Sequence, residues 1–260
     1  MIKFVFLRII KNTSLIFLAL VANICGLAQN DTNAIGFHYV AINFGGHLPK
    51  GDLEKRFGPN LNVGGTYFYK TKRNWQFGVE GNYFFGQNVK EDVLANMKVE
   101  FNNSNTSIID NEGYPADIRI TERGLCFFGV AGRIFRLFKN NLNTGIVFNV
   151  GVGYMQHKIN LYDAQKKIAA LNGELRYGYD RLSNGFSTMQ FLGYQYISNS
   201  KFINFYAGFE FIQGYTKSVR KFNYDTGLPD TEKRTDLLIG LRLGWILPLY
   251  KRKPKEYYYY

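Results

Sequence analysis

Residues 75 to 87 read WQFGVEGNYFFGQ and alternate between two kinds of side chain. Aromatic and aliphatic residues hold one parity, broken only by Gly81, while polar residues and glycine hold most of the other. A period of two is typical of a β-strand with one apolar face. Similar segments recur about eight times, and no amphipathic helix between them could cover the apolar faces. The pattern therefore predicts a closed barrel whose apolar face meets lipid.

The start of the chain predicts a cleaved signal peptide over residues 1–28. The basic residue Lys3 precedes an apolar run that ends in small residues, the last of them Ala28. The alternative is a membrane anchor, but the unbroken apolar part, 15–22, is shorter than the roughly 20 residues that span a bilayer. Cleavage would remove one of the two cysteines and leave Cys126 without a partner for an internal disulfide.

Composition narrows the class of protein. The 260 residues carry a formal net charge of +12, and 17% of them are aromatic. Nucleic-acid binding would require the basic residues to gather on one face or helix, whereas here they lie mostly between predicted strands. A mean hydropathy of −0.21 argues against a helical membrane protein and is normal for a barrel with a polar lumen. We therefore expect an outer-membrane barrel of one domain and no nucleic-acid partner.

Eight antiparallel strands are expected, joined by connections that alternate long and short. If both termini are periplasmic, every short connection is periplasmic and every long one lies at the cell surface, as outer-membrane barrels require. The expected strands cover 35–44, 60–70, 75–87, 121–136, 143–156, 186–198, 202–213 and 236–247. The expected organisation is a signal peptide over 1–28, a short periplasmic segment over 29–34, an up-and-down transmembrane β-barrel over 35–250, and a basic, tyrosine-rich periplasmic tail over 251–260.

The inward parity predicts a charge network in the lumen. Side chains just fill an eight-stranded barrel, so buried charges there have to pair. This packing favours a structural network over a proton or ion path, and no diffusion pore is expected. The predicted members are Glu80, Glu210, Arg123, Arg133 and Arg242. The same parity places Phe128, Val130 and Ile134 on the outer wall.

Two further features belong to the expected periplasmic side. An interfacial aromatic girdle is predicted from Tyr69, Trp75, Phe138, Phe202 and Trp245. The tail, KRKPKEYYYY, has two roles that stay open: a disordered end held at the membrane surface by its charge, or a docking segment for a periplasmic protein. The docking residues would be Lys251, Arg252, Lys253, Tyr257, Tyr258, Tyr259 and Tyr260. The other expected partners are outer-membrane lipid and lipopolysaccharide.

The sequence offers little for catalysis. His38, His47 and His157 are the chain's three histidines, and none lies in a spaced motif with serine, as an outer-membrane hydrolase would need. No group of His, Asp and Glu has the spacing of metal ligands. We therefore predict that the protein is not an enzyme and has no metal site and no cofactor.

Across 35–250 the chain resembles the small eight-stranded outer-membrane barrels of the OmpA and OmpX type. Strings such as GYDRLSNGF (178–186) and INFYAGFEF (203–211), with a leader ending in Ala-Gln, are similar to barrels of Bacteroidota. Within the first string, Arg181 belongs either to a contact site at the rim or to a tight loop.

That resemblance implies a role as an accessory of an envelope secretion or assembly machine. The expected function is therefore that of a non-enzymatic scaffold or adaptor in the outer membrane. The alternative is a surface binding protein that uses its long loops, and a lipid-modifying hydrolase is less favoured.

Overall fold

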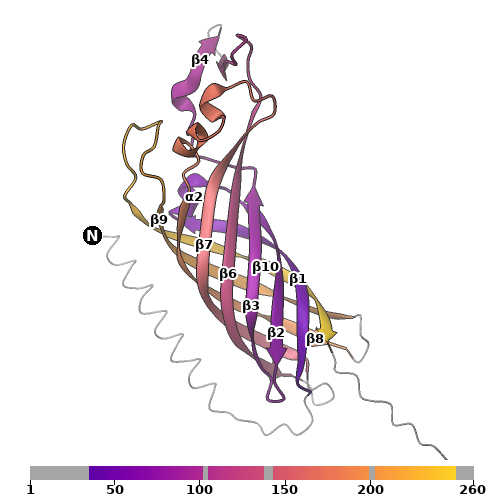
Figure 1. The fold of residues 1–260 in the computed structure, drawn as a ribbon. Coiled ribbons are helices and arrows are strands. Elements are labelled where there is room, and N and C mark those ends of the chain that lie inside the picture. Colours follow the sequence, from indigo (N-terminus) through magenta and orange to yellow (C-terminus); the bar gives the residue numbers. More distant parts are fainter. Residues whose placement is uncertain (1–34, 102–104, 138–142, 199–202, 250–260) are drawn as a thin grey trace, which may run out of the picture. The chain divides into compact units, whose positions relative to one another are not determined.

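Eight antiparallel strands close into a barrel in the computed structural model, which describes residues 35–101, 105–137, 143–198 and 203–249 (Figure 1). Strands that follow one another around the barrel pair with each other, and the first closes the ring against the last. The predicted all-β, eight-stranded, up-and-down fold is confirmed. The barrel strands are β1 (Phe37–Gly51), β2 (Asn60–Lys70), β3 (Trp75–Gly86), β6 (Ile118–Arg136), β7 (Gly145–Asp163), β8 (Ser183–Ile197), β9 (Asn204–Ser218) and β10 (Lys233–Leu249).

The predicted signal peptide over 1–28, the segment over 29–34 and the tail over 251–260 lie outside the described residues. Among the residues that are described, no helix has the length and apolar character needed to cross a membrane.

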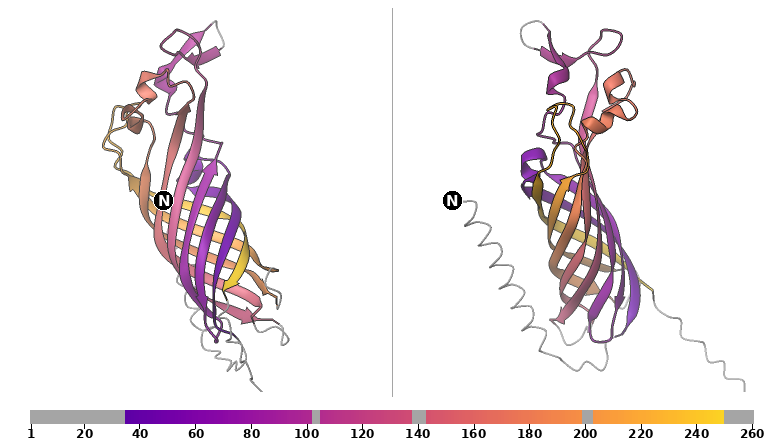
Figure 2. Two further views of the ribbon diagram at one scale, coloured as in Figure 1. Left: turned by 45° about the vertical axis from the view of Figure 1, so that its right-hand side comes forward. Right: turned by 60° about the vertical axis from the view of Figure 1, so that its left-hand side comes forward.

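Long and short connections lie at opposite ends of the barrel (Figure 2). The long ones carry the remaining regular structure: α2 (Leu53–Arg56), η1 (Ala95–Met97), β4 (Lys98–Phe101), β5 (Asn105–Ile108), η2 (Ala169–Leu171) and η3 (Leu175–Gly178). Several strands run further toward this loop end than the sequence predicts. Beyond Phe44, for example, β1 continues to pair with β10 as far as Gly51. Apolar alternation fades there because the wall has left the lipid, but the backbone ladder still satisfies its hydrogen bonds.

The two faces of β3 follow the predicted alternation. Phe77, Val79, Tyr83 and Phe85 are exposed on the outer wall, whereas Gln76, Glu80, Asn82 and Phe84 are buried in the lumen. The other strands complete an apolar outer belt. It includes Val40, Ile42, Tyr67, Phe127, Val150, Val152, Leu192, Phe205, Phe209, Leu241 and Leu243. In water such a surface would be a severe liability, so the belt is the wall that faces lipid.

The parity predicted for β6 is wrong. Phe128, Val130 and Ile134 are buried inside the barrel, and the predicted lumen residues Arg123 and Arg133 lie on the outer face. This strand has apolar residues on both faces, so the alternation could not distinguish them. The two arginines lie toward the ends of the strand, where long side chains can reach water along an outer surface.

Candidate functional site

A buried ion-pair network occupies the middle of the lumen. Arg242 Nη1 donates to Glu80 Oε1 and, at 2.7 Å, to Glu210 Oε1. The other oxygen of Glu210 lies 2.8 Å from His47 Nε2, and the Asn82 amide donates to Glu80 Oε1 at 2.5 Å. These side chains come from four different strands and are almost completely buried. Charges so buried are stable only when paired, so the lumen network fixes the strands around it.

Aromatic rings pack around this network. The Arg242 guanidinium carbon lies 4.4 Å from the ring centroid of Phe191 and 5.6 Å from that of Tyr206, within cation–π range. The two rings meet edge to face at 5.5 Å. Glycines make room for them: a Cβ at Gly244 would lie only 2.2 Å from Tyr206 Cζ. The middle of the lumen is therefore packed with side chains, as the barrel's size predicts.

A second buried group lies toward the loop end. His157 Nε2 is 2.9 Å from Asp236 Oδ2, and Thr216 Oγ1 donates to the same oxygen at 2.5 Å. The Phe57 ring meets the His157 ring edge to face at 5.8 Å, at the end of α2. Imidazole and hydroxyl both bind the carboxylate and not each other, so these three residues do not form the nucleophile–base relay of a hydrolase.

The structure brings together only some of the predicted lumen charges. Glu80, Glu210 and Arg242 meet in the network, whereas Arg123 and Arg133 are on the outer wall. The guanidinium carbon of Arg133 lies 5.3 Å from the ring centroid of Trp75.

His47, which lies beyond the strand expected over 35–44, points into the lumen. The sequence does contain an indication of this position, because His47 has the same inward parity as Asn43 on the same strand. The glycines at 45 and 46 suggested a turn, so the strand was expected to end before His47.

The predicted aromatic girdle is only partly described. Tyr69, Trp75 and Trp245 lie toward the barrel end with the short turns, while Phe138 and Phe202 lie outside the described residues. Lys70, at the end of β2 next to a short turn, is buried, and its Nζ donates to Asn143 Oδ1 at 2.9 Å. The buried Lys70 side chain therefore occupies the inside of the barrel at the end with the short turns.

A chain of ion pairs joins all four long connections at the loop end. Glu91 accepts from Arg56 Nε and Arg181 Nε, each at 2.9 Å, and Arg181 Nη2 lies 2.5 Å from Asp225 Oδ2. Arg181 has a φ of 50°, an unusual backbone conformation for a residue with a side chain. Burial lowers the pKa of Arg56, and the Glu91 carboxylate opposes that shift. We call Arg56, Glu91, Arg181 and Asp225 the four-loop clasp.

Further contacts hold the third and fourth long connections together. The Tyr224 N–H donates to Gly178 O at 3.0 Å, and the Tyr224 ring occupies the space that a Cβ on Gly178 would need. Arg220 donates two bonds to Asp180, at 2.8 and 2.5 Å, and these raise the pKa of Arg220. Its guanidinium carbon lies 4.4 Å from the Tyr177 ring centroid. The third and fourth long connections are thus joined by backbone, ion-pair and ring contacts.

Large apolar side chains remain exposed at the loop end of the barrel. The exposed loop set consists of Tyr162, near the end of β7, and the loop residues Tyr114, Leu175, Tyr177, Phe222, Tyr224 and Leu228, with exposed fractions from 40% to 66%. No three His, Cys, Asp or Glu of the described residues lie in an arrangement that could hold a metal ion. Cys126 is buried and unoxidised.

The closed eight-stranded ring, its apolar belt and its packed polar lumen define the class: a small outer-membrane β-barrel of the OmpA and OmpX architecture. No protein-family model matches the chain, and no curated protein does. Similar solved structures include Neisserial surface protein A, with 11% identity over 79% of this chain and 95% of that one and a TM-score of 0.38. Ail of Yersinia pestis has 11% sequence identity over 82% of this chain and 99% of Ail, with a TM-score of 0.36. OprG of Pseudomonas aeruginosa has 11% sequence identity over 83% of this chain and 98% of OprG, with a TM-score of 0.39.

Proposed function

We propose that this protein is a non-enzymatic outer-membrane scaffold that binds a macromolecular partner with its long loops. The observation that carries the proposal is the four-loop clasp, in which Glu91 and Arg181 connect all four long connections. Loops held in one arrangement lose less conformational entropy when a partner binds. A clasp of partly buried ion pairs is therefore better suited to a preformed binding platform than to flexible connections.

The exposed loop set supports a protein or glycan partner. Aromatic side chains are enriched at the energetic centres of interfaces, and Tyr177 and Tyr224 lie exposed on loops that the clasp and its neighbours hold in place.

Contacts of the three histidines support the absence of catalysis. His47 and His157 are buried against the carboxylates of Glu210 and Asp236. His38 lies on the outer wall, where its Nδ1 is 2.8 Å from the Tyr67 hydroxyl. Among the described contacts, none of these imidazoles is paired with a serine hydroxyl, which is the arrangement that a hydrolase of this class would need.

The proposed orientation follows the lengths of the connections. In bacterial barrels the short turns are periplasmic and the long loops are extracellular. On this basis the clasp and the exposed loop set face the outside of the cell, and the turn at 71–74 faces the periplasm.

Trimming one loop tests the proposed function. Lys98 and Ile108 are register partners in the β4–β5 hairpin, so two glycines can replace residues 99–107 and leave the clasp intact. The envelope phenotype of a deletion strain should return with the full-length gene and with a version ending at Tyr250, but not with the trimmed loop. Rescue by the trimmed loop would exclude the hairpin from the binding platform.

A second candidate is an adaptor within an envelope secretion or assembly machine that docks through the tail over 251–260. The strongly basic character of the short-turn end favours an acidic partner there. Under this alternative the version ending at Tyr250 would fail to rescue, and its co-purifying companion would be lost from mild-detergent extracts.

A further inference from the structure

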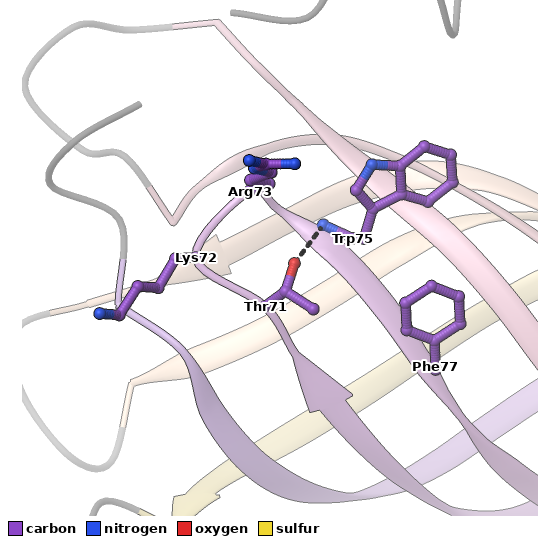
Figure 3. A pocket seen from close by; sticks show the side chains of 5 residues that line it. All are labelled: Thr71, Lys72, Arg73, Trp75 and Phe77. Carbon is purple, nitrogen blue, oxygen red and sulfur yellow. Dashed lines mark hydrogen bonds between the residues drawn. The ribbon is translucent and has the colours of Figure 1, made fainter. Parts of the chain in front are cut away.

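A hollow of about 470 Å³ lies on the outside of the turn between β2 and β3 (Figure 3). It is lined by Thr71, Lys72, Arg73, Trp75 and Phe77. Lys72 and Arg73 are exposed at the tip of the turn, and the two aromatic residues follow along β3. One small site thus combines two cationic side chains with an apolar wall.

The turn is held in a defined conformation. Thr71 N–H donates to Trp75 O at 2.7 Å, and Trp75 N–H donates to Thr71 Oγ1 at 3.1 Å. Asn74 adopts a φ of 62°, which reverses the chain, and its carbonyl accepts from Ile134 N–H on β6 at 2.9 Å. The backbone that carries the two cationic side chains is therefore fixed against the barrel before any ligand arrives.

The apolar part of the hollow matches a hydrocarbon chain. Trp75 and Phe77 share the outer face of β3, with ring centroids 6.3 Å apart and planes only 10° from parallel. Phe77 is 48% exposed, and its neighbour across the β3–β6 ladder is the small residue Ala131. These rings belong to the belt that faces lipid, so acyl chains and not water surround them.

Among the described residues, the charged side chains at this end of the barrel are basic. Around the hollow they are Lys72, Arg73, Arg133 and Arg136, with Lys70 buried nearby. The carboxylates of Glu80 and Glu210, further along the lumen, are buried and bound by Arg242. The described strand segments that form this end contain no Asp or Glu: 36–45, 60–79, 127–137, 143–153, 188–198, 203–209 and 241–249.

We propose that the hollow binds one anionic glycerophospholipid, with its phosphate at the turn that carries Lys72 and Arg73 and an acyl chain along Trp75 and Phe77. Basic residues attract anionic lipids at membrane surfaces, and a single-sign end strengthens that attraction. Charge-assisted hydrogen bonds from ammonium and guanidinium groups would select the phosphate, and the ring wall would select the chain. The inference is independent of the loops, because the hollow lies at the opposite end of the barrel.

The two tryptophans of the chain, Trp75 and Trp245, allow a site-resolved test. In a full-length W245F variant, Trp75 is the sole tryptophan and reports on the hollow. Its fluorescence is measured in vesicles that mix phosphatidylglycerol and phosphatidylcholine, with bromine on the acyl chains of one lipid or the other. We expect phosphatidylglycerol to bind beside Trp75 about fivefold more strongly than phosphatidylcholine, the preference that roughly one basic charge confers.

Two controls separate a site from general attraction. The preference should fall to within about twofold of equality in K72Q/R73Q, whereas K217Q/K233Q, which removes the same charge at the loop end, should retain it. A W75F variant reports from Trp245, outside the hollow, and should show the weaker preference. Folding of each variant is checked by its heat-modifiable gel mobility. Equal preferences at the two tryptophans, or an undiminished preference in K72Q/R73Q, would overturn the proposal.

Discussion

His47 Nε2 lies 2.8 Å from Glu210 Oε2 in the middle of the barrel, although 163 positions separate the two residues in the chain. This contact uses one carboxylate oxygen of Glu210, and Arg242 uses the other. Glu80 differs, because both of its bonds go to Oε1, and Oε2 has no hydrogen-bond partner among the described residues. Glu210 therefore uses both carboxylate oxygens in the lumen network, whereas Glu80 uses one.

Amide substitutions should expose that inequality. In E80Q the new amide can take the place of the unpartnered oxygen, so the free energy of unfolding should fall by less than about 1 kcal/mol. In E210Q a donor must face either Arg242 or His47, and the loss should be roughly 2–3 kcal/mol. Urea unfolding in lipid vesicles measures both. Equal losses in the two variants would contradict the assigned bonds.

Removing Arg242 should be more damaging than removing any arginine of the outer wall. R242M leaves Glu80 and Glu210 buried without a cationic partner between them, which should cost about 3–5 kcal/mol. R123M is the matched control, since the structure places Arg123 on the exposed face, and its loss should stay within roughly 0.5 kcal/mol. The same unfolding assay compares them. A large loss of unfolding free energy in R123M would indicate that Arg123 lies in the lumen after all.

Two glycines on β6 should respond oppositely to an added methyl group. A Cβ at Gly124 would lie 2.0 Å from Phe84 Cζ inside the barrel, whereas at Gly129 the nearest atom is Val152 O at 3.9 Å. G124A should lose about 1–3 kcal/mol through overpacking, while G129A should fold like the wild type. Refolding yield, read from heat-modifiable mobility, distinguishes the two. Tolerance of G124A together with failure of G129A would mean that the parity of β6 is reversed.

Breaking the four-loop clasp should loosen several connections at once. Arg181→Ala removes one of the two ion-pair partners of Glu91 and the ion-pair partner of Asp225, so amide exchange should rise roughly tenfold or more in 88–94 and 222–228. Lys55→Ala removes a surface ion pair with Asp52 and should leave these segments unchanged. Hydrogen exchange with mass spectrometry resolves the peptides. A rise confined to the residues next to Arg181 would show that the clasp does not couple the loops.

The turn at Asp110 should weaken in acid. The Tyr114 backbone N–H, at 2.9 Å, and that of Glu112 stabilise the carboxylate and lower the pKa of Asp110. Its contribution to stability is therefore complete above the unfolded pKa of about 4 and is lost as the pH falls through the folded pKa. Exchange protection of these two amides, corrected for intrinsic rates, should drop between pH 6 and about pH 2. D110A, which has no side-chain oxygen to accept these bonds, should show low protection at both values, and a wild type that keeps its protection at about pH 2 would refute the prediction.

How far the sequence alone could predict side-chain direction depends on the difference in polarity between the outer and inner faces of each strand. In β3 the outer residues are apolar and the inner ones are mostly polar, so side-chain direction could be predicted from Trp75 to Gly86. In β6 both faces are apolar, and two arginines near the strand ends were misleading because their length lets them reach water from either face. Periodicity reports direction only where the two environments differ.

The candidate sites depend on contacts that no local pattern encodes. His47 follows two glycines, and only its continued pairing with β10 reveals that it points into the lumen. The clasp joins residues of four connections, and loops carry no periodicity from which their partners could be inferred. Arg181 stood out in the sequence, but its partner Glu91 is 90 positions away.

The lengths of β6 and β7 set how far the loop end stands from the apolar belt. Each has 19 residues, whereas about 9–11 suffice to cross a bilayer. The surplus of roughly eight residues per strand corresponds to about 25 Å along the strand. Inserting or deleting two residues in both strands would move the loop end by about 7 Å and keep every side chain on its own face. The distance between the loop end and the apolar belt can therefore change in discrete steps, without redesigning either the barrel or the loops.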